Sequence, residues 1–466
     1  AVGSQAMAAT DTGVDYNNGL GYQALYANTG SKNNAFGYQA LGGGTAGNFN
    51  CAFGHESGEA VTTGAYNVFM GFATGKANTT GDNNVFIGGE AGEANTTGDS
   101  NIGIGLRALE ANTTSNNNLA IGQDALKVNT AANNVALGNY NLDANTTGDG
   151  NTAVGYGVLQ ANTTADGNVA VGRNSMTANT TGTVNTAVGT YSLDANTTGG
   201  YNVAIGNEAM TDANTDLCVA VGHQAMFENT TGNYQTAIGA NALYTCTTGV
   251  RNTSLGYSTT YYLTTGQKNV TVGYAAGHAI TTGDNNICIG EAAGRSNSPS
   301  GDITTGSNNV VLGNNDIANL YCADTSISSS DARDKTDIED FKYGLSWITE
   351  LRPVTYRWDR RTWYGDDEQS KGTPDGSKKR DRIHIGFIAQ EAIEVEKKHG
   401  YAGKKDDMLI VNQDENEDDP SYGMKYERLV PVLVNAIKEL KAENDELRSL
   451  IKDSKTFASL KSSINN

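Results

Sequence analysis

A serine and a lysine five residues apart, Ser330 and Lys335, are the side chains whose types best suit covalent chemistry in this chain. A serine hydroxyl beside an amine that accepts its proton makes a nucleophile and base pair able to attack a peptide carbonyl. The serine hydroxyl also lies one short ring from the carbonyl before it, so attack within the chain needs no separate substrate. This spacing is common by chance, and a polar linker of mixed charge is the alternative interpretation.

The two residues lie where the composition changes. Residues 1–330 hold 8 Lys and Arg against 23 Asp and Glu, whereas residues 331–466 have the mixed composition of a globular domain. The net charge of −19 argues against a nucleic-acid partner, because the phosphates would be repelled. No stretch is apolar over the roughly 18 residues that a membrane helix needs, so we expect no membrane insertion. The chain opens AVGSQAMAAT, without an initiator Met, and we expect an attachment region to precede it.

A repeat of 17 residues, occasionally 16, fills the first part of the chain. Each copy reads Asn, a short apolar run, Gly, a second apolar residue four positions on, and commonly Ala-Asn-Thr-Thr-Gly. The run bounded by Asn and Gly predicts one short strand per copy, and stacked copies bury a core that one copy cannot. The glycines that follow the predicted strands are Gly21, Gly37, Gly54, Gly71, Gly88, Gly105, Gly122, Gly138, Gly155, Gly172, Gly189, Gly206, Gly222, Gly239, Gly256, Gly273 and Gly290, with a looser copy at Gly313.

The apolar residues of each copy predict a thin interior. The residue before the Gly is large in most copies and the one before that is small, and we expect both to interdigitate inside the coil. Gly is expected to supply the positive φ that the turns need. No proline occurs before Pro299, which suits a ladder that uses almost every backbone N–H. The thin core favours several intertwined chains over one.

The units NVAIGNEAM, NVAVGRNSM and NLAIGQDAL resemble the head repeats of trimeric autotransporter adhesins, the YadA-like left-handed β-roll. The resemblance covers about residues 17–313, although the period here is longer. It implies three parallel chains with their cores side by side, and it does not fix what the rod binds.

Two recurring polar patterns have a chemical and a structural interpretation. Asn-Thr-Thr fits the N-glycosylation sequon, and Asp82-Asn83-Asn84 offers oxygen ligands for Ca²⁺. Turn formers that recur because the coil recurs explain both patterns, and we expect no metal and no cofactor. The asparagines of the sequon are Asn78, Asn95, Asn112, Asn145, Asn162, Asn179, Asn196 and Asn229.

Acids, histidines and cysteines of the repeats are also expected to be structural or solvated. The acids fall at variable repeat positions, without the fixed pairs or fixed aromatic residues that a glycosidase site would favour. The histidines follow the strand Gly and are expected at the surface, while five cysteines without a CxxC pair predict small apolar fillers. The acids are Glu90, Glu93, Asp143 and Asp194, and the histidines are His55 and His223. The cysteines are Cys51, Cys218, Cys246, Cys288 and Cys322.

The region after residue 341 predicts a small α+β fold. YGLSWITELRPVTYRWD reads as an amphipathic helix stopped by Pro353 and followed by a strand. A polar insertion, RTWYGDDEQSKGTPDGSKKRDR, suits a hairpin tip, and IHIGFIAQEAIEVEKKHG predicts a strand that turns into a helix. YGMKYERLVPVLVNAIKELKAENDELRSLI predicts a long final helix.

The final helix carries apolar residues at heptad spacing, which predicts a parallel coiled coil among copies of the chain. An Asn at a core position costs stability but fixes register. A helix packed on its own domain is the alternative, because three heptads are few. The predicted register positions are Leu433, Ile437, Leu440, Asn444, Leu447 and Ile451.

SSDARDK, LRPVTYRW, GFIAQE and YERLVPVLVNAIKELKAENDEL together resemble the C-terminal intramolecular chaperone of phage tailspikes and tail fibres. This is the self-cleaving peptidase family of endosialidase tailspikes, and the resemblance covers about residues 329–455. It implies that Ser330 is the nucleophile and Lys335 the base. The bond that is cut then joins Ser329 to Ser330.

Residues beside the dyad also match or depart from the family motif. The resemblance implies that Asp331 and Arg333 position the reacting groups. Asp334 departs from the pattern, because the residue before the lysine is often apolar in the family. A carboxylate there favours protonated Lys335, so we expect it to slow the cut.

We therefore predict a mainly β fold, a trimeric parallel β-solenoid or β-roll, followed by a small α+β chaperone domain and a trimeric coiled-coil helix. Removal of the chaperone after assembly would leave a rod that persists kinetically. The expected domains are residues 1–315 (shaft), 316–329 (junction), 330–428 (chaperone and autoprotease) and 429–466 (coiled-coil helix and tail).

The expected function is that of a homotrimeric phage tail fibre, assembled in the bacterial cytoplasm and matured by self-cleavage. Expected partners are other tail proteins of the virion and a host-surface glycan or protein. A polysaccharide depolymerase and a bacterial trimeric surface adhesin are the alternatives. The predicted C-terminal helix, where such adhesins have a membrane anchor, argues against the adhesin.

Overall fold

The computed structural model describes two compact units. The N-terminal unit comprises Ala1–Gly294 with Ile303–Asn314, and the C-terminal unit comprises Arg295–Asp302 with Asn315–Asn466. None of the helices in the described part of the chain combines the length and apolar character needed to cross a membrane. The described residues are 1–8, 15–317, 336–361, 364, 372–413, 420 and 422–453.

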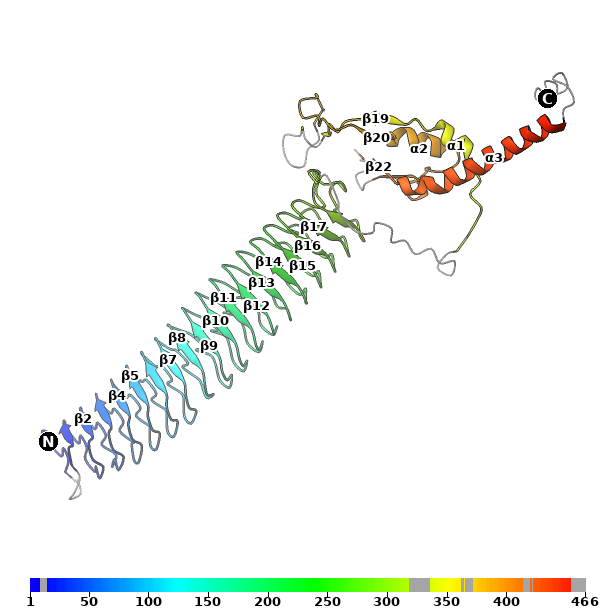
Figure 1. Ribbon diagram of the computed structural model, residues 1–466. Coiled ribbons are helices and arrows are strands. Elements are labelled where there is room, and N and C mark those ends of the chain that lie inside the picture. Colours follow the sequence, from blue (N-terminus) through cyan, green and yellow to red (C-terminus); the bar gives the residue numbers. More distant parts are fainter. Residues whose placement is uncertain are drawn as a thin grey trace. The chain divides into compact units, whose positions relative to one another are not determined.

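The N-terminal unit is a parallel β-solenoid, as the repeat predicted (Figure 1). Each coil contributes one strand of three residues, and each strand pairs in parallel and in register with the same positions of the next coil. The strands are β1 Asn18–Leu20, β2 Asn34–Phe36, β3 Cys51–Phe53, β4 Val68–Met70, β5 Val85–Ile87, β6 Ile102–Ile104, β7 Leu119–Ile121, β8 Val135–Leu137, β9 Thr152–Val154, β10 Val169–Val171, β11 Thr186–Val188, β12 Val203–Ile205, β13 Val219–Val221, β14 Thr236–Ile238, β15 Thr253–Leu255, β16 Val270–Val272, β17 Ile287–Ile289 and β18 Val310–Leu312.

The interior of the solenoid is thinner than the sequence suggested. Only the central residue of each strand is buried, and it is usually Ala. It packs against the apolar residue four positions past the Gly, such as Leu109 or Leu126, which is fully buried as expected. The expectation that the large residue before the Gly also lies inside is wrong. Because successive strand side chains alternate between faces, a buried small residue places its large neighbours outside.

Volume is conserved where a large residue does enter the coil. Phe69 and Phe86 occupy the central strand position, and Gly75 and Gly92 then replace the buried Leu. A Cβ on Gly75 would lie 2.4 Å from the ring of Phe69, and one on Gly92 would lie 2.5 Å from that of Phe86. The core therefore tolerates either one large strand residue or one large turn residue in a coil.

Positive φ is not confined to glycine in this solenoid. Leu109, Leu126 and Met176 adopt φ of 57°, 52° and 52° at the buried turn position, which corrects the expectation that Gly alone serves there. Each such residue costs roughly 1–3 kcal/mol. The backbone bonds that join coils, for example Leu109 N to Ala125 O at 3.1 Å, hold it in this conformation.

The asparagines of the Asn-Thr-Thr pattern are buried turn residues. All eight are fully buried. Asn162 and Asn179 show the pattern, because each donates Nδ2 both to the Asn Oδ1 of the preceding coil and to a carbonyl three residues on. The turn-former interpretation is confirmed, and burial keeps these amides from a glycosylating enzyme in the folded rod.

We expect Asn179→Leu to lower the free energy of unfolding of the rod by roughly 2–4 kcal/mol. Asn179 donates to Asn162 Oδ1 at 3.1 Å and to Gly182 O at 3.0 Å, and it accepts from Asn196 Nδ2 at 2.8 Å. The leucine leaves these buried groups without a partner. Denaturant unfolding followed by circular dichroism measures the change.

Asn229→Leu is the matched control. Its side chain bonds to Gly232 within its own turn, and the same column continues with Cys246 and Leu263, so the column is already apolar there. We expect a clearly smaller loss than for Asn179→Leu. Equal losses would contradict a stabilising role for the bonds between coils.

The C-terminal unit is a small α+β fold, as predicted. Pro353 lies three residues past the end of α1 at Glu350, and the C-cap residue between them, Leu351, is already extended at φ −75° and ψ 132°. β19 pairs antiparallel with β20, and β21 with β22. The elements are α1 Leu345–Glu350, β19 Val354–Tyr356, β20 His384–Gly386, α2 Ala389–Lys398, the 3₁₀ turns Lys405–Asp407 and Tyr426–Arg428, β21 Val411–Gln413, β22 Tyr422–Met424 and α3 Leu429–Asp453.

Candidate functional site

The predicted dyad lies outside the residues that the structure describes. This holds for Ser329, Ser330, Asp331, Arg333 and Lys335. Their roles therefore stay predictions. The described chain resumes at Thr336.

The segment that follows the dyad is bound to helix α3. Asn435 of α3 donates from Nδ2 to the carbonyl of Phe341 at 2.6 Å, and Glu439 accepts from the backbone N–H of Leu345 at 2.6 Å. Gly344 lies so close to α3 that a Cβ there would meet the backbone nitrogen of Ala436 at 2.5 Å. Only glycine allows this approach, so the chain from 341 to 345 is fixed to one face of the helix.

Helix α3 has a second face that none of the residues described by the structure covers. Its inner face buries Leu429, Val432 and Ala436 against the C-terminal unit. The predicted register positions lie outside that contact, and Ile437 leaves 64% and Ile451 51% of its surface exposed. Leu433, Leu440, Asn444 and Leu447 are exposed as well.

A buried glutamate in α2, which the sequence analysis missed, holds the unit together. Glu396 is fully buried, and its carboxylate accepts backbone N–H groups from Leu409 at 3.0 Å, Ile410 at 2.7 Å and Val411 at 3.1 Å. These bonds attach the chain entering β21 to α2. The position of Glu396 four residues after the buried Ala392 was the sequence pattern that could have revealed it.

An aromatic cluster forms the centre of this unit. Trp347 of α1 is fully buried and stacks on His399 with ring centroids 5.3 Å apart, while Phe341 and Tyr401 pack beside it at 5.3 and 5.8 Å. Phe341 thus contacts both this core and α3. The segment around Phe341 is therefore part of the folded core of the unit.

The acids of the rod do not form the carboxylate pair of a glycosidase at Asp143 and Asp194. Contrary to the expectation of variable repeat positions, these two occupy the same repeat position. They lie three coils apart, which is roughly 14 Å at the spacing of neighbouring strands. That exceeds the 5–9.5 Å over which paired carboxyl groups act.

Three other carboxylates do come together. Glu90, Glu93 and Glu110 have oxygens within 4.8 Å of one another on the partly exposed surface. Burial, and then repulsion from Glu90 and Glu110, raises the pKa of Glu93. Lys127 lies 3.9 Å from Glu110, so the cluster is partly neutralised, and by itself it identifies neither a metal site nor an active site.

We expect the rod to gain stability as the pH falls through about 6. Burial, with Asp212 and Glu208 nearby, raises the pKa of Asp194 to about 6 from 3.8. The native rod then binds this proton at a higher pH than the unfolded chain, so stability rises as pH falls toward 4 and is lost as pH rises again. Allowing for solvent screening, the gain is roughly 1–2 kcal/mol. Unfolding at pH 7.5 and 5 measures it, and Asp194→Asn, with no carboxyl to titrate, should show a smaller difference.

Aromatic residues do recur at one repeat position in the last coils, contrary to expectation. Phe227, Tyr244, Tyr261 and His278 each lie five positions past the strand Gly and stack at 5.2, 4.9 and 5.4 Å. Each ring covers the face of the next. The column therefore offers few free ring faces for stacking on sugars, and it does not identify a glycan site.

The two histidines that follow a strand Gly lie at the surface, as predicted. His55 is half exposed and stacks between Tyr38 and Phe72 at 4.7 and 5.5 Å, and His223 is exposed. The Asp82 carboxylate accepts the backbone N–H of Ala65 in the preceding coil at 2.7 Å, so this bond links two neighbouring coils.

Four cysteines are described, and all are free thiols. Cys218, Cys246 and Cys288 are buried fillers, and burial raises the thiol pKa of Cys246 and of Cys288 to about 11. Cys51 alone among them is partly exposed. Cys322 lies outside the described residues.

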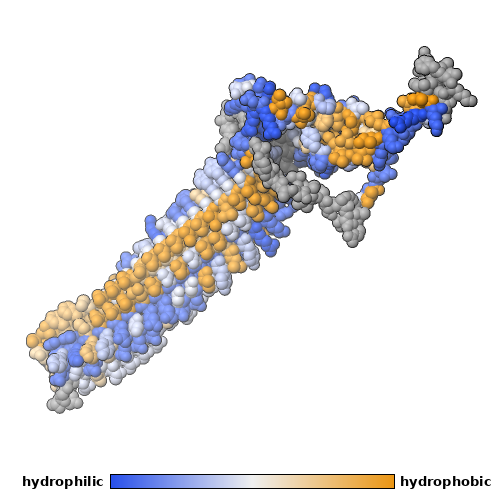
Figure 2. Space-filling model, viewed as in Figure 1, coloured by the Kyte–Doolittle hydropathy of each residue, from blue (hydrophilic) through white to orange (hydrophobic). Residues whose placement is uncertain are grey.

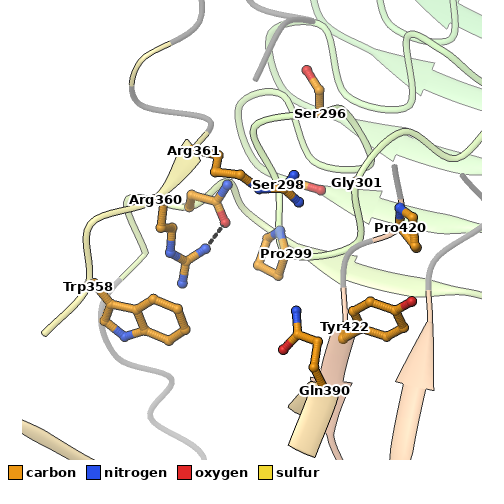
Figure 3. A pocket seen from close by; sticks show the side chains of 11 residues that line it. Ser296, Ser298, Pro299, Gly301, Trp358, Arg360, Arg361, Gln390, Pro420 and Tyr422 are labelled. Atoms are coloured by element: carbon orange, nitrogen blue, oxygen red, sulfur yellow. Dashed lines mark hydrogen bonds between the residues drawn. The ribbon is translucent and has the colours of Figure 1, made fainter. Parts of the chain in front are cut away.

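A cavity of about 380 Å³ in the C-terminal unit carries two guanidinium groups and two aromatic rings (Figure 3). Such groups suit an anionic ligand. Arg360, however, already lies 4.3 Å over the ring of Trp358 and bonds to Asn315. Burial, with Arg380 nearby, also lowers the pKa of Arg360. The cavity therefore identifies no ligand.

Residues 330–401 match a protein family described as chaperone of endosialidase. No match was found among curated proteins or solved structures. The matched segment begins at Ser330 and contains α1, β19, β20 and α2. The chaperone resemblance is confirmed over these residues, which follow the parallel β-solenoid.

Proposed function

We propose that this chain is the subunit of a homotrimeric phage tail fibre or tailspike-type appendage of the virion, with a C-terminal chaperone that releases itself. The family match suggests such a protein with a chaperone at this end. The proposal of self-release rests on one observation. The family match begins at Ser330, the residue that the motif identifies as the nucleophile. A released segment would begin at this residue.

The proposed cut proceeds within the chain. Lys335 takes the proton of the Ser330 hydroxyl, the oxygen attacks the carbonyl carbon of Ser329, and the bond to the Ser330 nitrogen breaks as that nitrogen gains a proton. Water then hydrolyses the ester, which leaves a carboxylate on Ser329. Lys335 acts as a base only when it has lost its proton, a state that burial favours and the neighbouring Asp334 opposes.

The tether to α3 supports a link between cleavage and assembly. Asn435 and Glu439 bind the segment 341–345, which follows the dyad by only a few residues. An adjacent, exposed side of the same helix carries the predicted coiled-coil residues. Trimerisation through this side would therefore order the helix that binds residues 341–345, the segment downstream of the predicted dyad.

The solenoid explains why a chaperone is needed. Because its coils repeat, sliding one chain by a coil keeps nearly every side chain on the same face, and register is weakly specified. A C-terminal unit that trimerises first brings the chain ends together and raises their effective concentration. The rod can then assemble from that end, and the mature fibre would contact a host-surface glycan or protein.

Expression of the wild-type chain tests this function. Intact mass is expected to show fragments of residues 1–329 and 330–466, and sedimentation is expected to show the first fragment as a trimer. A full-length monomer would refute the self-cleaving trimer. A full-length trimer would retain the assembly role and refute the cut.

A further inference from the structure

Two cations of the solenoid differ from the others because no described residue neutralises them. Residues 1–294 contain seven Lys and Arg. Five of these contact a carboxylate or lie over an aromatic ring, namely Lys32, Lys76, Arg107, Lys127 and Arg173. The side chains of Arg251 and Lys268 make no ion pair, hydrogen bond or ring contact with the described part of the chain. Both occupy the same repeat position in neighbouring coils, so two uncompensated charges lie one coil apart on an acidic rod.

Arg251 and Lys268 follow a run of large side chains at a strained turn position. This tip position, two residues before each strand, adopts a left-handed φ, for example 59° at Arg251. In the middle coils it holds Asn or Gly, such as Asn117 and Gly150, which adopt such angles at little cost. Nearer the end of the solenoid it holds residues that do so only under strain, and such strain is commonly kept at ligand sites. These residues are Val184, Tyr201, Leu217, Tyr234, Arg251 and Lys268.

The aromatic rings of this run are exposed. Tyr201 and Tyr234 leave 60% and 56% of their surface open, and neither ring stacks on another ring of the described residues. At the N-terminal end the tip residues do pair, since Phe49 and Tyr66 stack at 4.8 Å and Lys32 lies 4.6 Å over Phe49. Exposed apolar residues alone do not identify a site, because Figure 2 shows a broad apolar band along the coils. What distinguishes this run is that exposed rings adjoin unpartnered cations.

Lys268 also lines a polar groove of about 370 Å³ at the last coils. The groove offers amides, a hydroxyl, a carboxylate and the Lys268 ammonium, which together can donate to and accept from a ligand. Asn285 and Asn308 continue the tip position along the groove, and Asn285 Nδ2 donates to Asn308 Oδ1 at 2.8 Å. From Tyr201 to Asn308 the tip position extends over roughly 29 Å at the spacing of neighbouring strands, and we call this line of residues the tip track. The other residues that line the groove are Gln267, Asp284 and Ser307.

The chemistry of the tip track suits a strand of acidic sugars. The apolar face of a sugar ring packs on Tyr and Leu side chains, while its hydroxyls bond to amides and a carboxylate. Carboxylate or phosphate groups on the strand match Arg251 and Lys268. A protein partner is disfavoured, because a specific interface takes about 800 Å² from each partner and the track is one side chain wide. A nucleic acid carries a phosphate on every nucleotide, and the net charge of −19 repels it.

We propose that the tip track binds one extended strand of an acidic polysaccharide. Its sugar rings pack on Tyr201, Leu217 and Tyr234, and its carboxylate or phosphate groups bind Arg251 and Lys268. The inference rests on the proposed function, in which the fibre contacts a host-surface glycan. It adds the site on the rod and the charge that the glycan must carry.

Removal of charge tests the two cations. The wild-type chain is passed over immobilised polygalacturonate, which carries carboxylates, and over ribitol teichoic acid, which carries phosphates. Dextran serves as the uncharged glycan and polyglutamate as the acidic polymer without sugars. We expect binding to an acidic glycan that weakens about tenfold or more in Arg251→Gln with Lys268→Gln. Lys32→Gln with Arg173→Gln is the matched control, because it removes the same charge and Lys32 also holds a tip position. It should bind as the wild type does.

Replacement of the tyrosines separates ligand contact from folding. Tyr201→Asn with Tyr234→Asn gives the tip the residue that the middle coils carry, as at Asn117. Because Asn adopts a left-handed φ more readily than Tyr, we expect this variant to unfold at a higher temperature and yet to bind the acidic glycan more weakly. Thermal unfolding and surface plasmon resonance measure the two changes. Unchanged binding would contradict the contact with the rings.

The outcomes separate this inference from the proposed function. A chain that cleaves and forms a trimer but binds neither acidic glycan, or binds dextran or polyglutamate as strongly, refutes the tip track and leaves the proposed assembly standing. Equal loss of binding in the control pair also refutes it, because overall charge would then explain the effect. A chain that neither trimerises nor cleaves refutes the proposed function, whatever it binds.

Discussion

A chain carrying Ser330→Ala is expected to stay at its full length, whereas the wild type separates into residues 1–329 and 330–466. Alanine removes the only hydroxyl that the motif places one short ring from the Ser329 carbonyl, so no ester can form. Lys335→Arg should also block the cut, because a guanidinium stays protonated and cannot accept the hydroxyl proton. Intact-mass spectrometry after expression measures both.

The neighbouring serine supplies the control. Ser328→Ala makes the same chemical change two residues upstream and should leave cleavage at the wild-type rate. Ser330→Ala should still form a trimer, since the register positions of α3 are unchanged. Cleavage of Ser330→Ala at the same bond would rule out the Ser–Lys mechanism, and an uncut Ser328→Ala chain would place the nucleophile elsewhere.

The architecture of the rod was largely readable from the sequence. The regular spacing of the post-strand glycines predicted one strand per coil, and the structure has those strands in parallel register. The sequence did not reveal which strand side chains face the interior of the coil, since the alternation of large and small residues alone does not say which side is inside. The decision depends on Leu109 and its equivalents, which already fill the coil and leave room only for Ala beside them.

In the C-terminal unit, too, some features could be predicted from the sequence and others could not. Pro353 and the apolar spacing of α1 and α3 predicted those helices, because both are local features of the chain. Glu396 could not be separated from the solvated glutamates around it by composition. Its role depends on the backbone of residues 409–411, which only the tertiary fold brings against α2. The dyad was identified by motif, and its geometry is not described.

Replacement of Glu396 by Gln is expected to unfold the C-terminal unit and with it both trimerisation and cleavage. The buried carboxylate accepts three backbone N–H groups with two oxygens. A glutamine side chain has only one oxygen. Its NH2 group would take the place of the second oxygen, so a donor would face a backbone N–H, which is also a donor. Ile410 and Val411 share one oxygen, so glutamine loses the bond from Leu409 and weakens the other two, which no longer end on a charged group. A bond to a buried carboxylate is worth roughly 1.5–3 kcal/mol, so the loss of several kcal/mol is a large part of the stability of a small domain.

Glu391→Gln on the same helix is the matched control. Its carboxylate is exposed and pairs with Arg352 at the surface, where screening by solvent leaves such an ion pair little effect on stability. We expect this variant to cleave and trimerise as the wild type does, while Glu396→Gln accumulates as full-length chain without a trimer. If Glu396→Gln cleaved normally, the attachment of β21 to α2 would be dispensable. Cleavage would then depend on the tether of residues 341–345 to α3 alone, which Asn435→Ala would test.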